Sequence, residues 1–379
     1  MSIYLDHAAP TPMNPVALDA MTEALSRIGN PSSLHTDGRT VRKYVEDARD
    51  LLAKNIDCAA SEIIFTGSGT EANNIAIKGI YWQRNSEKSR PVIITSAIEH
   101  QAVLEPAQWL VAHEGARHIE FPVTENGVIN LDALRLLITE HGDSIALISV
   151  MHSNNETGVI QPIADVVEIA GDIPVHSDAI QSWGKVDFSF KSLGLFAASL
   201  SGHKVGGPIG IGILVLRRGI DIPALIHGGG QEREIRSGTV NAPSIIALAA
   251  AISKPQYSAD SVRALRESFE SKLKMVLPDS IINSATADRL PGISSVTIPG
   301  ALNETLLLLL DGEQISCSTG AACTAGVHRP SHVLEAMGLD EDSVMATLRF
   351  SLGSTTTQSD VDAVISALPG VVERARSAR

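Results

Sequence analysis

The chain has 379 residues, of which 44% are hydrophobic and 19% are charged, and its formal net charge is −13. The length allows two domains, and the composition is ordinary for a globular enzyme. The negative charge argues against direct binding of nucleic acid or of anionic membranes.

Neither a membrane span nor secretion is expected from the sequence. The longest apolar runs, 245–252 and 306–310, are too short to cross a bilayer. The first residues lack the basic stretch and the apolar stretch of a secretory signal. The three cysteines form an odd, sparse set without a CxxC pair, which argues against a disulfide framework and a structural zinc site. We therefore expect a cytoplasmic protein.

Short apolar, β-branched runs alternate with longer helical stretches up to about residue 256. Continuous apolar strands separated by helices indicate a buried, mostly parallel sheet. From about Tyr257 the pattern changes to an amphipathic helix, a strand at 295–298 and a helix at 303–310, which indicates a smaller α+β domain. The strands expected in the large sheet are 62–66, 92–95, 145–150, 174–178, 195–200 and 212–216, with a helix beginning near Thr70 after the first of them.

Polar residues follow several of these strands at the points where the strands end. In an open α/β sheet, ligands bind outside the carboxyl ends of the strands. These clusters are therefore the strongest indication of an active site in the chain. They comprise residues 67–70, 99–100, 154–156, 178–181 and 201–204.

The first of these clusters, Gly67-Ser68-Gly69-Thr70, stands between a strand and a helix. Free backbone N–H groups and the helix dipole at such a helix start can hold a phosphate. The cluster lacks the lysine of a P-loop and the third glycine of a dinucleotide fingerprint. A tight strand-to-helix turn without a ligand is the alternative interpretation.

Asp178 and Lys204 stand at the ends of two other strands. A carboxylate in that position suits a cationic ring nitrogen, such as the pyridinium of pyridoxal phosphate, with a helix N-cap as the alternative. Lys204 follows an apolar strand and small residues, where partial desolvation would make its amine a nucleophile for a Schiff base. Neighbouring Ser201 and His203 would add donors for a phosphate. An exposed loop lysine is the alternative for Lys204.

Two further residues have both a functional and a structural interpretation. His100 follows a strand, where its ring could stack on a cofactor and move protons, although single histidines are more often structural. Arg349 has apolar neighbours on both sides, and an arginine in such a strand usually has a dedicated anion. That anion is either a substrate carboxylate, bound in bidentate fashion, or a protein carboxylate in a buried ion pair.

A cysteine near the C-terminus stands among small residues. The run 316–326 holds Cys323 in a composition that suits neither a core helix nor a core strand. We expect a mobile loop that presents one thiol and carries a group between sites. Cys317 is interpreted as a small residue at the start of this loop, with a second reactive thiol as the alternative, and Cys58 as a packing or surface residue.

Taken together, these motifs resemble those of the NifS/IscS cysteine desulfurases, within the class V aminotransferase group of fold type I pyridoxal-phosphate enzymes. The resemblance extends over nearly the whole chain. It implies a large α/β domain, residues 15–255, with a mostly parallel sheet flanked by helices that binds pyridoxal 5'-phosphate. Residues 1–14 and 256–379 would form the smaller α+β domain, including the Cys323 loop. The motifs that carry the resemblance are 4–9, 29–33, 69–71, 99–100, 151–158, 178–182, 201–204, 236–239, the Cys323 loop and 348–353.

The resemblance implies roles for individual residues, with Cys323, Lys204 and His100 as the catalytic ones. Lys204 would form the Schiff base with the cofactor, Asp178 would pair with the pyridine nitrogen, and His100 would stack on the ring. Arg349 would bind the substrate carboxylate. Cys323 would be the nucleophile and persulfide carrier, and a candidate transient ligand of an iron–sulfur cluster, with no resident metal in the protein.

The remaining implied roles concern the ring and the phosphate of the cofactor. Gln181 and Asn155 would face the hydroxyl side of the ring, with Asn155 also near the substrate. The phosphate would be held by the residues of two strand ends, joined by one residue from the partner subunit of a homodimer. These are Gly69, Thr70, Ser201 and His203, with Thr239 from the partner.

The activity that the resemblance implies is conversion of L-cysteine to L-alanine, with transfer of the sulfur to Cys323 as a persulfide. An acceptor protein, either an iron–sulfur scaffold or a tRNA thiolase, would then take the sulfur for iron–sulfur cluster assembly or tRNA thiolation. The alternatives are a selenocysteine lyase, an ordinary class V aminotransferase, or a non-catalytic sulfur-transfer partner protein. The chain departs from the family pattern at His7, Pro10 and Ser354, where Asn, Thr and Arg are common, and in the additional Cys317.

Overall fold

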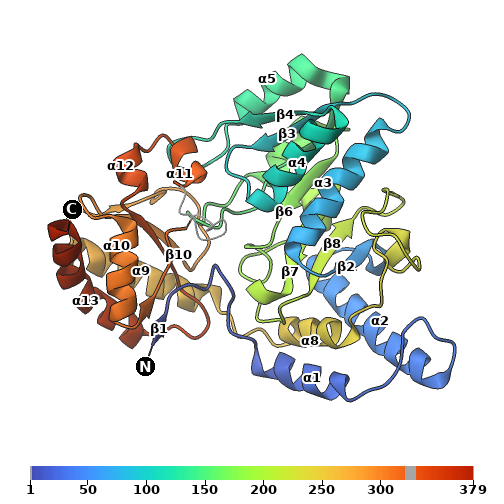
Figure 1. Ribbon diagram of the computed structural model, residues 1–379, viewed down its shortest axis with the longest axis horizontal. Coiled ribbons are helices and arrows are strands. Elements are labelled where there is room, and N and C mark those ends of the chain that lie inside the picture. Colours follow the sequence, from blue (N-terminus) through green and yellow to red (C-terminus); the bar gives the residue numbers. More distant parts are fainter. Residues whose placement is uncertain (1, 321–329, 379) are drawn as a thin grey trace.

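The computed structural model describes residues 2–320 and 330–378. Its largest element is a seven-stranded sheet with the strand order β2-β8-β7-β6-β5-β3-β4 (Figure 1). Neighbouring strands are parallel except at β8, which is antiparallel to both of its neighbours. The strands are β2 (Ile63–Thr66), β3 (Val92–Ser96), β4 (Arg117–Phe121), β5 (Ile145–Ser149), β6 (Val175–Asp178), β7 (Ala197–Ser201) and β8 (Gly212–Leu216).

The central strands are buried along their whole length. Every residue of β3, β5, β6, β7 and β8 is buried, as expected of a parallel sheet with helices on both faces. The prediction of a buried, mostly parallel sheet is confirmed. The sequence pattern does not indicate β4, because this edge strand exposes Arg117 and Glu120 and lacks a continuous apolar run.

Helices cover the sheet on both faces (Figure 1). Alternate strand residues point to opposite faces. Ile93 packs with α3 and α4 in one apolar cluster, whereas Ile94 packs with α2, α6 and α8 in another. None of the helices within residues 2–320 and 330–378 is long and apolar enough to cross a membrane. The helices of this part are α1 (Pro15–Leu25), α2 (Thr36–Ile56), α3 (Gly69–Asn85), α4 (Gln101–Glu114), α5 (Leu131–His141), α6 (Ile163–Ala170), α7 (Phe190–Leu193) and α8 (Ala242–Ser253).

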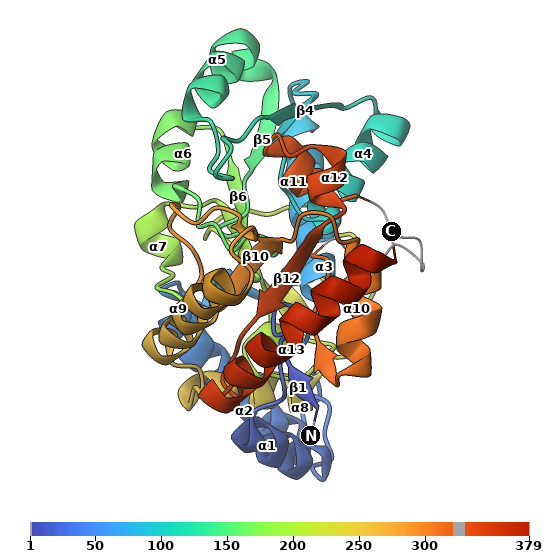
Figure 2. The ribbon, with the colours of Figure 1, turned by 90° about the vertical axis from the view of Figure 1, so that its left-hand side faces the viewer.

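The C-terminal part of the chain forms a smaller body with its own core (Figure 2). β10 (Ile293–Thr297) pairs antiparallel with β9 (Ile281–Ile282) and β12 (Thr347–Ser351). β1 (Ile3–Tyr4) runs parallel to β11 (Ile315–Ser316), so the first residues of the chain belong to this body. The separate core supports the division at residues 14 and 256, which stays a prediction. Its helices are α9 (Ala259–Val276), α10 (Asn303–Gly312), α11 (His332–Ala336), α12 (Glu341–Val344) and α13 (Gln358–Ser377).

Candidate active site

A cavity of about 350 Å³ lies between the carboxyl ends of the sheet strands and the smaller body. Asp6, Ser318 and Arg349 form the wall that the smaller body contributes. The structure thus brings together motifs that are far apart in the sequence. The predicted site residues that line this cavity are Gly69, Thr70, His100, Asn155, Asp178, Gln181, Ser201, His203, Lys204 and Arg349.

Two predicted site residues are not among the described residues that line this cavity. Thr239 is exposed, in the loop between the 3-10 helix η4 (Glu232–Glu234) and α8, and does not line the cavity of its own chain. Cys323 lies outside the described residues. Gly320, however, lines the cavity, and the backbone of Ser318 pairs with that of Arg349. The chain therefore reaches the cavity three residues before Cys323.

Asp178 ends β6 with a buried carboxylate whose two oxygens have separate partners. Oδ2 accepts a hydrogen bond from Asn73 Nδ2 of α3 at 2.7 Å, and Oδ1 accepts one from the backbone N–H of Ile180 at 3.0 Å. Burial raises the pKa of Asp178, and the interaction with His100 offsets part of that effect. The contact with Ile180 is a local turn, but no helix begins within residues 179–189, so Asp178 is not a helix N-cap.

Lys204 ends the 3-10 helix η3 (Gly202–Lys204), directly after β7. Its Nζ atom donates a hydrogen bond to the carbonyl oxygen of Ala8 at 2.6 Å. Burial, followed by the positive charge of Arg349, lowers the pKa of Lys204 to about 8. An appreciable fraction of the amine is therefore neutral near neutral pH, which a nucleophilic lysine requires. This environment is not that of an exposed loop lysine.

The N-terminus of α3 faces the cavity at Gly69 and Thr70. Ser68 caps the helix by accepting a hydrogen bond from the backbone N–H of Glu71 at 3.0 Å. The preceding N–H groups have no partner within the helix and remain for an anion. A Cβ atom on Gly69 would lie 2.3 Å from Cδ1 of Ile180, so a side chain at this position would disturb the cavity wall.

Ser201 and His203 add polar atoms beside this helix start. Ser201 Oγ and His203 Nδ1 are 2.9 Å apart. Burial, and then the charges of Lys204 and Lys185, lowers the pKa of His203 to about 4, so the ring is neutral at neutral pH. A hydroxyl, a neutral imidazole and free backbone N–H groups form a donor set that suits a phosphate dianion.

His100 is the N-cap of α4, and its Nδ1 atom accepts a hydrogen bond from the backbone N–H of Ala102 at 3.0 Å. Burial lowers the pKa of His100, against the opposing effect of Asp178. The ring is then neutral, and because Nδ1 is an acceptor, the hydrogen is on Nε2. His100 therefore offers a flat ring and one N–H donor at the cavity wall.

Arg349 lies in β12 and has a protein carboxylate as its partner. One terminal nitrogen donates to Asp6 Oδ1 at 2.7 Å, and the other donates to the carbonyl oxygen of Asn155 at 2.9 Å. Arg349 thus has an ion-pair partner within the protein, and its role in binding a substrate carboxylate stays a prediction. The Nε atom of Arg349 is nevertheless buried without a hydrogen-bond partner. The two bonds use two of the five N–H donors of the guanidinium, and Arg349 lines the cavity.

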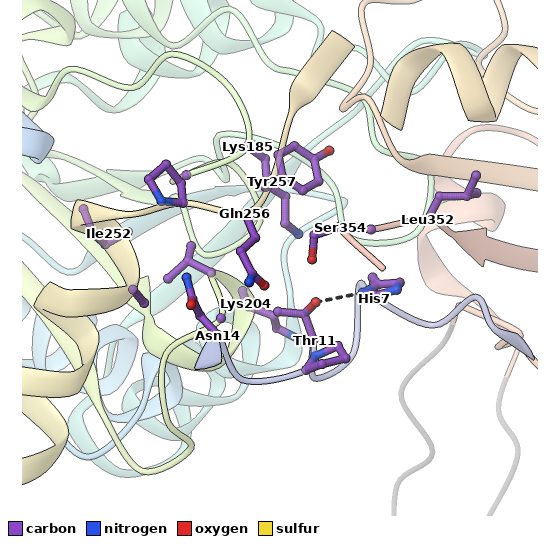
Figure 3. Close-up of a pocket in the computed structure, with 17 residues that line it drawn as sticks. His7, Thr11, Asn14, Lys185, Lys204, Ile252, Gln256, Tyr257, Leu352 and Ser354 are labelled. Atoms are coloured by element: carbon purple, nitrogen blue, oxygen red, sulfur yellow. Dashed lines mark hydrogen bonds between the residues drawn. The ribbon is translucent and has the colours of Figure 1, made fainter. Parts of the chain in front are cut away.

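Gln181 connects this site to a lysine that the sequence pattern does not indicate. Gln181 Nε2 donates to the same Ala8 carbonyl as Lys204, at 2.8 Å, and Gln181 Oε1 accepts from Lys185 Nζ, also at 2.8 Å. Burial, followed by the charge of Lys204, lowers the pKa of Lys185 to about 7. Lys185 and His7 line a second cavity of about 50 Å³ beside Lys204 (Figure 3).

Several polar residues in or behind the cavity wall have no role predicted from the sequence. Asp6, Glu99 and Glu156 stand inside motifs that carry the resemblance, but no role was assigned to them. Asn73 and Lys185 follow Gly69 and Gln181 by four residues, a spacing that places both members of such a pair on one face of a helix or turn. That spacing is the signal by which these two could have been found. The surroundings of the cavity therefore contain more ionisable side chains than the motifs alone indicate.

The cysteines within the described residues are poor nucleophiles. Burial, followed by neighbouring carboxylates, raises the pKa of Cys58 and of Cys317 to about 12. Both are therefore thiols at neutral pH, and only a thiolate attacks efficiently. Cys317 also packs against the core of the smaller body, which agrees with its interpretation as a small packing residue.

Comparisons with known proteins give the same family throughout. A sequence model of the family described as aminotransferase class-V matches residues 3–364. The IscS-like cysteine desulfurase of Mycobacterium tuberculosis is 46% identical, over 99% of this chain and 97% of that protein. Cysteine desulfurase NifS of Azotobacter vinelandii is 37% identical, over 99% of this chain and 94% of its own length.

Solved structures match equally fully. A NifS-like protein from Rickettsia africae superposes with a TM-score of 0.88 at 32% identity, over 98% of this chain and 100% of that chain. A structure described as SspA in complex with cysteine has a TM-score of 0.83 at 33% identity, over 94% of this chain and 100% of its own. The predicted α/β fold of the fold type I pyridoxal-phosphate enzymes is confirmed. The chain belongs to the aminotransferase class-V family.

Proposed function

We propose that the chain is a pyridoxal-phosphate-dependent cysteine desulfurase, which converts L-cysteine to L-alanine and carries the sulfur as a persulfide on Cys323. The observation that carries this proposal is the single cavity in which Lys204, Asp178, Arg349 and the start of α3 meet. Relatives named cysteine desulfurase, similar over nearly their whole length, support it. The SspA structure with cysteine supports the choice of substrate.

The residues around the cavity fit pyridoxal 5'-phosphate. The start of α3, with Ser201, would hold the phosphate, the buried carboxylate of Asp178 would pair with the ring nitrogen, and Lys204 would bind covalently. His100 would cover one face of the ring. When bound, the cofactor would withdraw electrons from the substrate and so make its Cα hydrogen acidic.

The side chains of the chain would divide the remaining tasks. Arg349, beside Asn155, would orient the substrate carboxylate, and the neutral amine of Lys204 would take the Cα proton. The thiolate of Cys323 would then attack the substrate sulfur. A sulfur–sulfur bond forms, the carbon–sulfur bond breaks with its electron pair left on carbon, and a proton adds there. The products are L-alanine and the Cys323 persulfide, without an external oxidant or reductant.

Two substitutions test this proposal. Lys204→Ala should abolish the visible absorbance of the covalently bound cofactor. Cys323→Ser should retain that absorbance and lose the formation of alanine from L-cysteine, because the sulfur has no acceptor. Alanine formation at the normal rate by Cys323→Ser would show that the carrier assignment is wrong. An ordinary aminotransferase would instead form no alanine from L-cysteine, because it transfers the amino group and leaves the carbon–sulfur bond intact. A selenocysteine lyase would instead show a much higher kcat/KM with selenocysteine than with cysteine.

We also propose a homodimer in the cytoplasm, in which Thr239 of one subunit contributes to the phosphate site of the other. The exposed position of Thr239, outside the cavity of its own chain, supports this arrangement. The sulfur acceptor would be an iron–sulfur scaffold protein, as the IscS and NifS names of the relatives suggest, or a tRNA thiolase. Transfer of labelled sulfur from the Cys323 persulfide to purified candidate acceptors distinguishes these two.

A further inference from the structure

The two ends of the segment that carries Cys323 meet at one buried carboxylate. Gly320, the last described residue before that segment, packs on the side chain of Glu156, since a Cβ atom on this glycine would lie 3.3 Å from Glu156 Oε2. Ser331, one residue after Pro330, donates a hydrogen bond from its hydroxyl to the same oxygen. Gly320 and Ser331, on either side of residues 321–329, therefore both lie beside Glu156 Oε2.

Glu156 lies next to residues that line the cavity, so a change in its position would displace them. It is 4% exposed, and it follows Asn155, whose carbonyl oxygen accepts a hydrogen bond from Arg349 at 2.9 Å. Its backbone N–H donates to Asn154 Oδ1 at 2.8 Å, which fixes the turn. Burial raises the pKa of Glu156, against the opposing effects of Ser331, His332 and Arg349.

The flanking residues hold both ends near the cavity by further contacts. On one side, the backbones of Ser318 and Arg349 exchange hydrogen bonds of 3.1 and 2.6 Å. On the other side, Ser331 caps α11 by accepting from the N–H of Leu334 at 3.1 Å, and a ring nitrogen of His332 lies 2.9 Å from the carbonyl oxygen of Glu99. Glu156 connects the two sides, because its Oε2 atom accepts a hydrogen bond from Ser331 and lies next to Gly320.

We propose that Glu156 is a positioning residue for sulfur transfer: by its hydrogen bond to Ser331 and its place beside Gly320, it fixes the two described ends of the segment that carries Cys323. This inference rests on the proposed desulfurase activity. Its consequence is selective, since steps that need only Lys204 should proceed without Glu156, whereas the step that needs Cys323 should not. A purely structural role would affect both kinds of step alike.

The experiment compares these two steps in the holoenzymes of Glu156→Ala and Glu156→Gln. Exchange of the Cα hydrogen of L-alanine with deuterated water reports on Lys204 and does not need Cys323. Alanine formation from L-cysteine in a single turnover reports on Cys323. We expect Glu156→Ala to keep the exchange rate and to slow the single turnover by roughly tenfold to a hundredfold, the range for leaving a buried hydroxyl without its hydrogen-bond partner. Glu156→Gln retains an acceptor oxygen for Ser331 and should recover most of the rate.

A second pair of variants keeps the test independent of how well the Glu156 variants fold. Ser331→Ala removes the hydroxyl and should slow the single turnover, whereas Ser331→Thr keeps it and should not. If the wild-type protein forms no alanine from cysteine, the proposed function fails. If the wild type does so, and Glu156→Ala and Ser331→Ala desulfurate at its rate or lose exchange and turnover in parallel, the positioning role is wrong.

Discussion

At the scale of single residues, the site depends on one lysine made less basic by its surroundings. Lys204 lies beside Arg349, and burial together with that charge lowers its pKa to about 8. Asp6 pairs with Arg349, and its negative charge raises the pKa of Lys204. The ion pair therefore weakens the effect of the guanidinium on that pKa. The same arginine that would bind the substrate carboxylate thus also prepares the nucleophile.

This arrangement predicts how capture of the cofactor depends on pH. Only the neutral amine of Lys204 reacts, and it becomes neutral as the pH rises through the pKa. The rate at which cofactor-free protein binds pyridoxal phosphate should therefore rise with a midpoint near pH 8 and level off at higher pH. Arg349→Met should shift this midpoint upward, because a positive charge is lost and Asp6 is left unpaired. Absorbance of the bound cofactor, followed in time at each pH, measures both.

The exposed pair of Arg374 and Glu313 offers a matched control. Arg374→Met removes the same type of side chain far from the cavity and should leave the midpoint unchanged. A rate that keeps rising toward pH 10 in the wild type would mean that Lys204 has an ordinary pKa and that the cavity does not tune it.

At the scale of elements, His7 of the N-terminal segment packs against the residues that follow β12. His7 is buried, its Nδ1 atom lies 2.7 Å from Thr11 Oγ1, and its Nε2 atom lies 3.3 Å from Thr355 Oγ1. A Cβ atom on Gly353 would lie 2.2 Å from His7 Nδ1 and within 2.6 Å of further ring atoms. Only glycine at position 353, just after β12, therefore allows this histidine.

We expect Gly353→Ala to lower the melting temperature of the protein. Forcing a methyl group against a fixed ring typically costs about 1–3 kcal/mol. The same substitution should cost much less in a His7→Ala background, because the ring that obstructs the methyl group is gone. Gly370→Ala, in α13, meets no atom within 4 Å and serves as the control, with no loss expected. An equal loss in both backgrounds would show that His7 does not restrict Gly353.

The helices and strands could largely be predicted from the sequence, but the contacts between them could not. Continuous apolar runs predicted the buried strands, and the glycines at 67 and 69 predicted the start of α3, because both signals are local. Asp6 and Arg349 are 343 residues apart, and nothing near either one identifies the other. The same holds for Asn73 and Asp178, which are 105 residues apart.

At the scale of the whole molecule, the active site exists only where two bodies meet. The sheet contributes Asp178 and Lys204, and the smaller body contributes Asp6, Arg349 and the residues that lead to Cys323. The predicted roles of these residues follow from a resemblance, and the structure adds that most of them share one cavity. Thr239 and Cys323 could not be placed in the same way, since one is exposed in a loop and the other lies outside the described residues.

The central claim is that sulfur leaves cysteine at this cavity and is held on Cys323. The most direct measurement is mass spectrometry of peptides from the holoenzyme after one turnover with L-cysteine, with the free thiols and persulfides alkylated before digestion. The account predicts one additional sulfur atom on the peptide that contains Cys323, in an amount equal to the alanine formed, and none on Cys58 or Cys317. Alanine formed without sulfur on Cys323, or with the additional sulfur on Cys317, would contradict it.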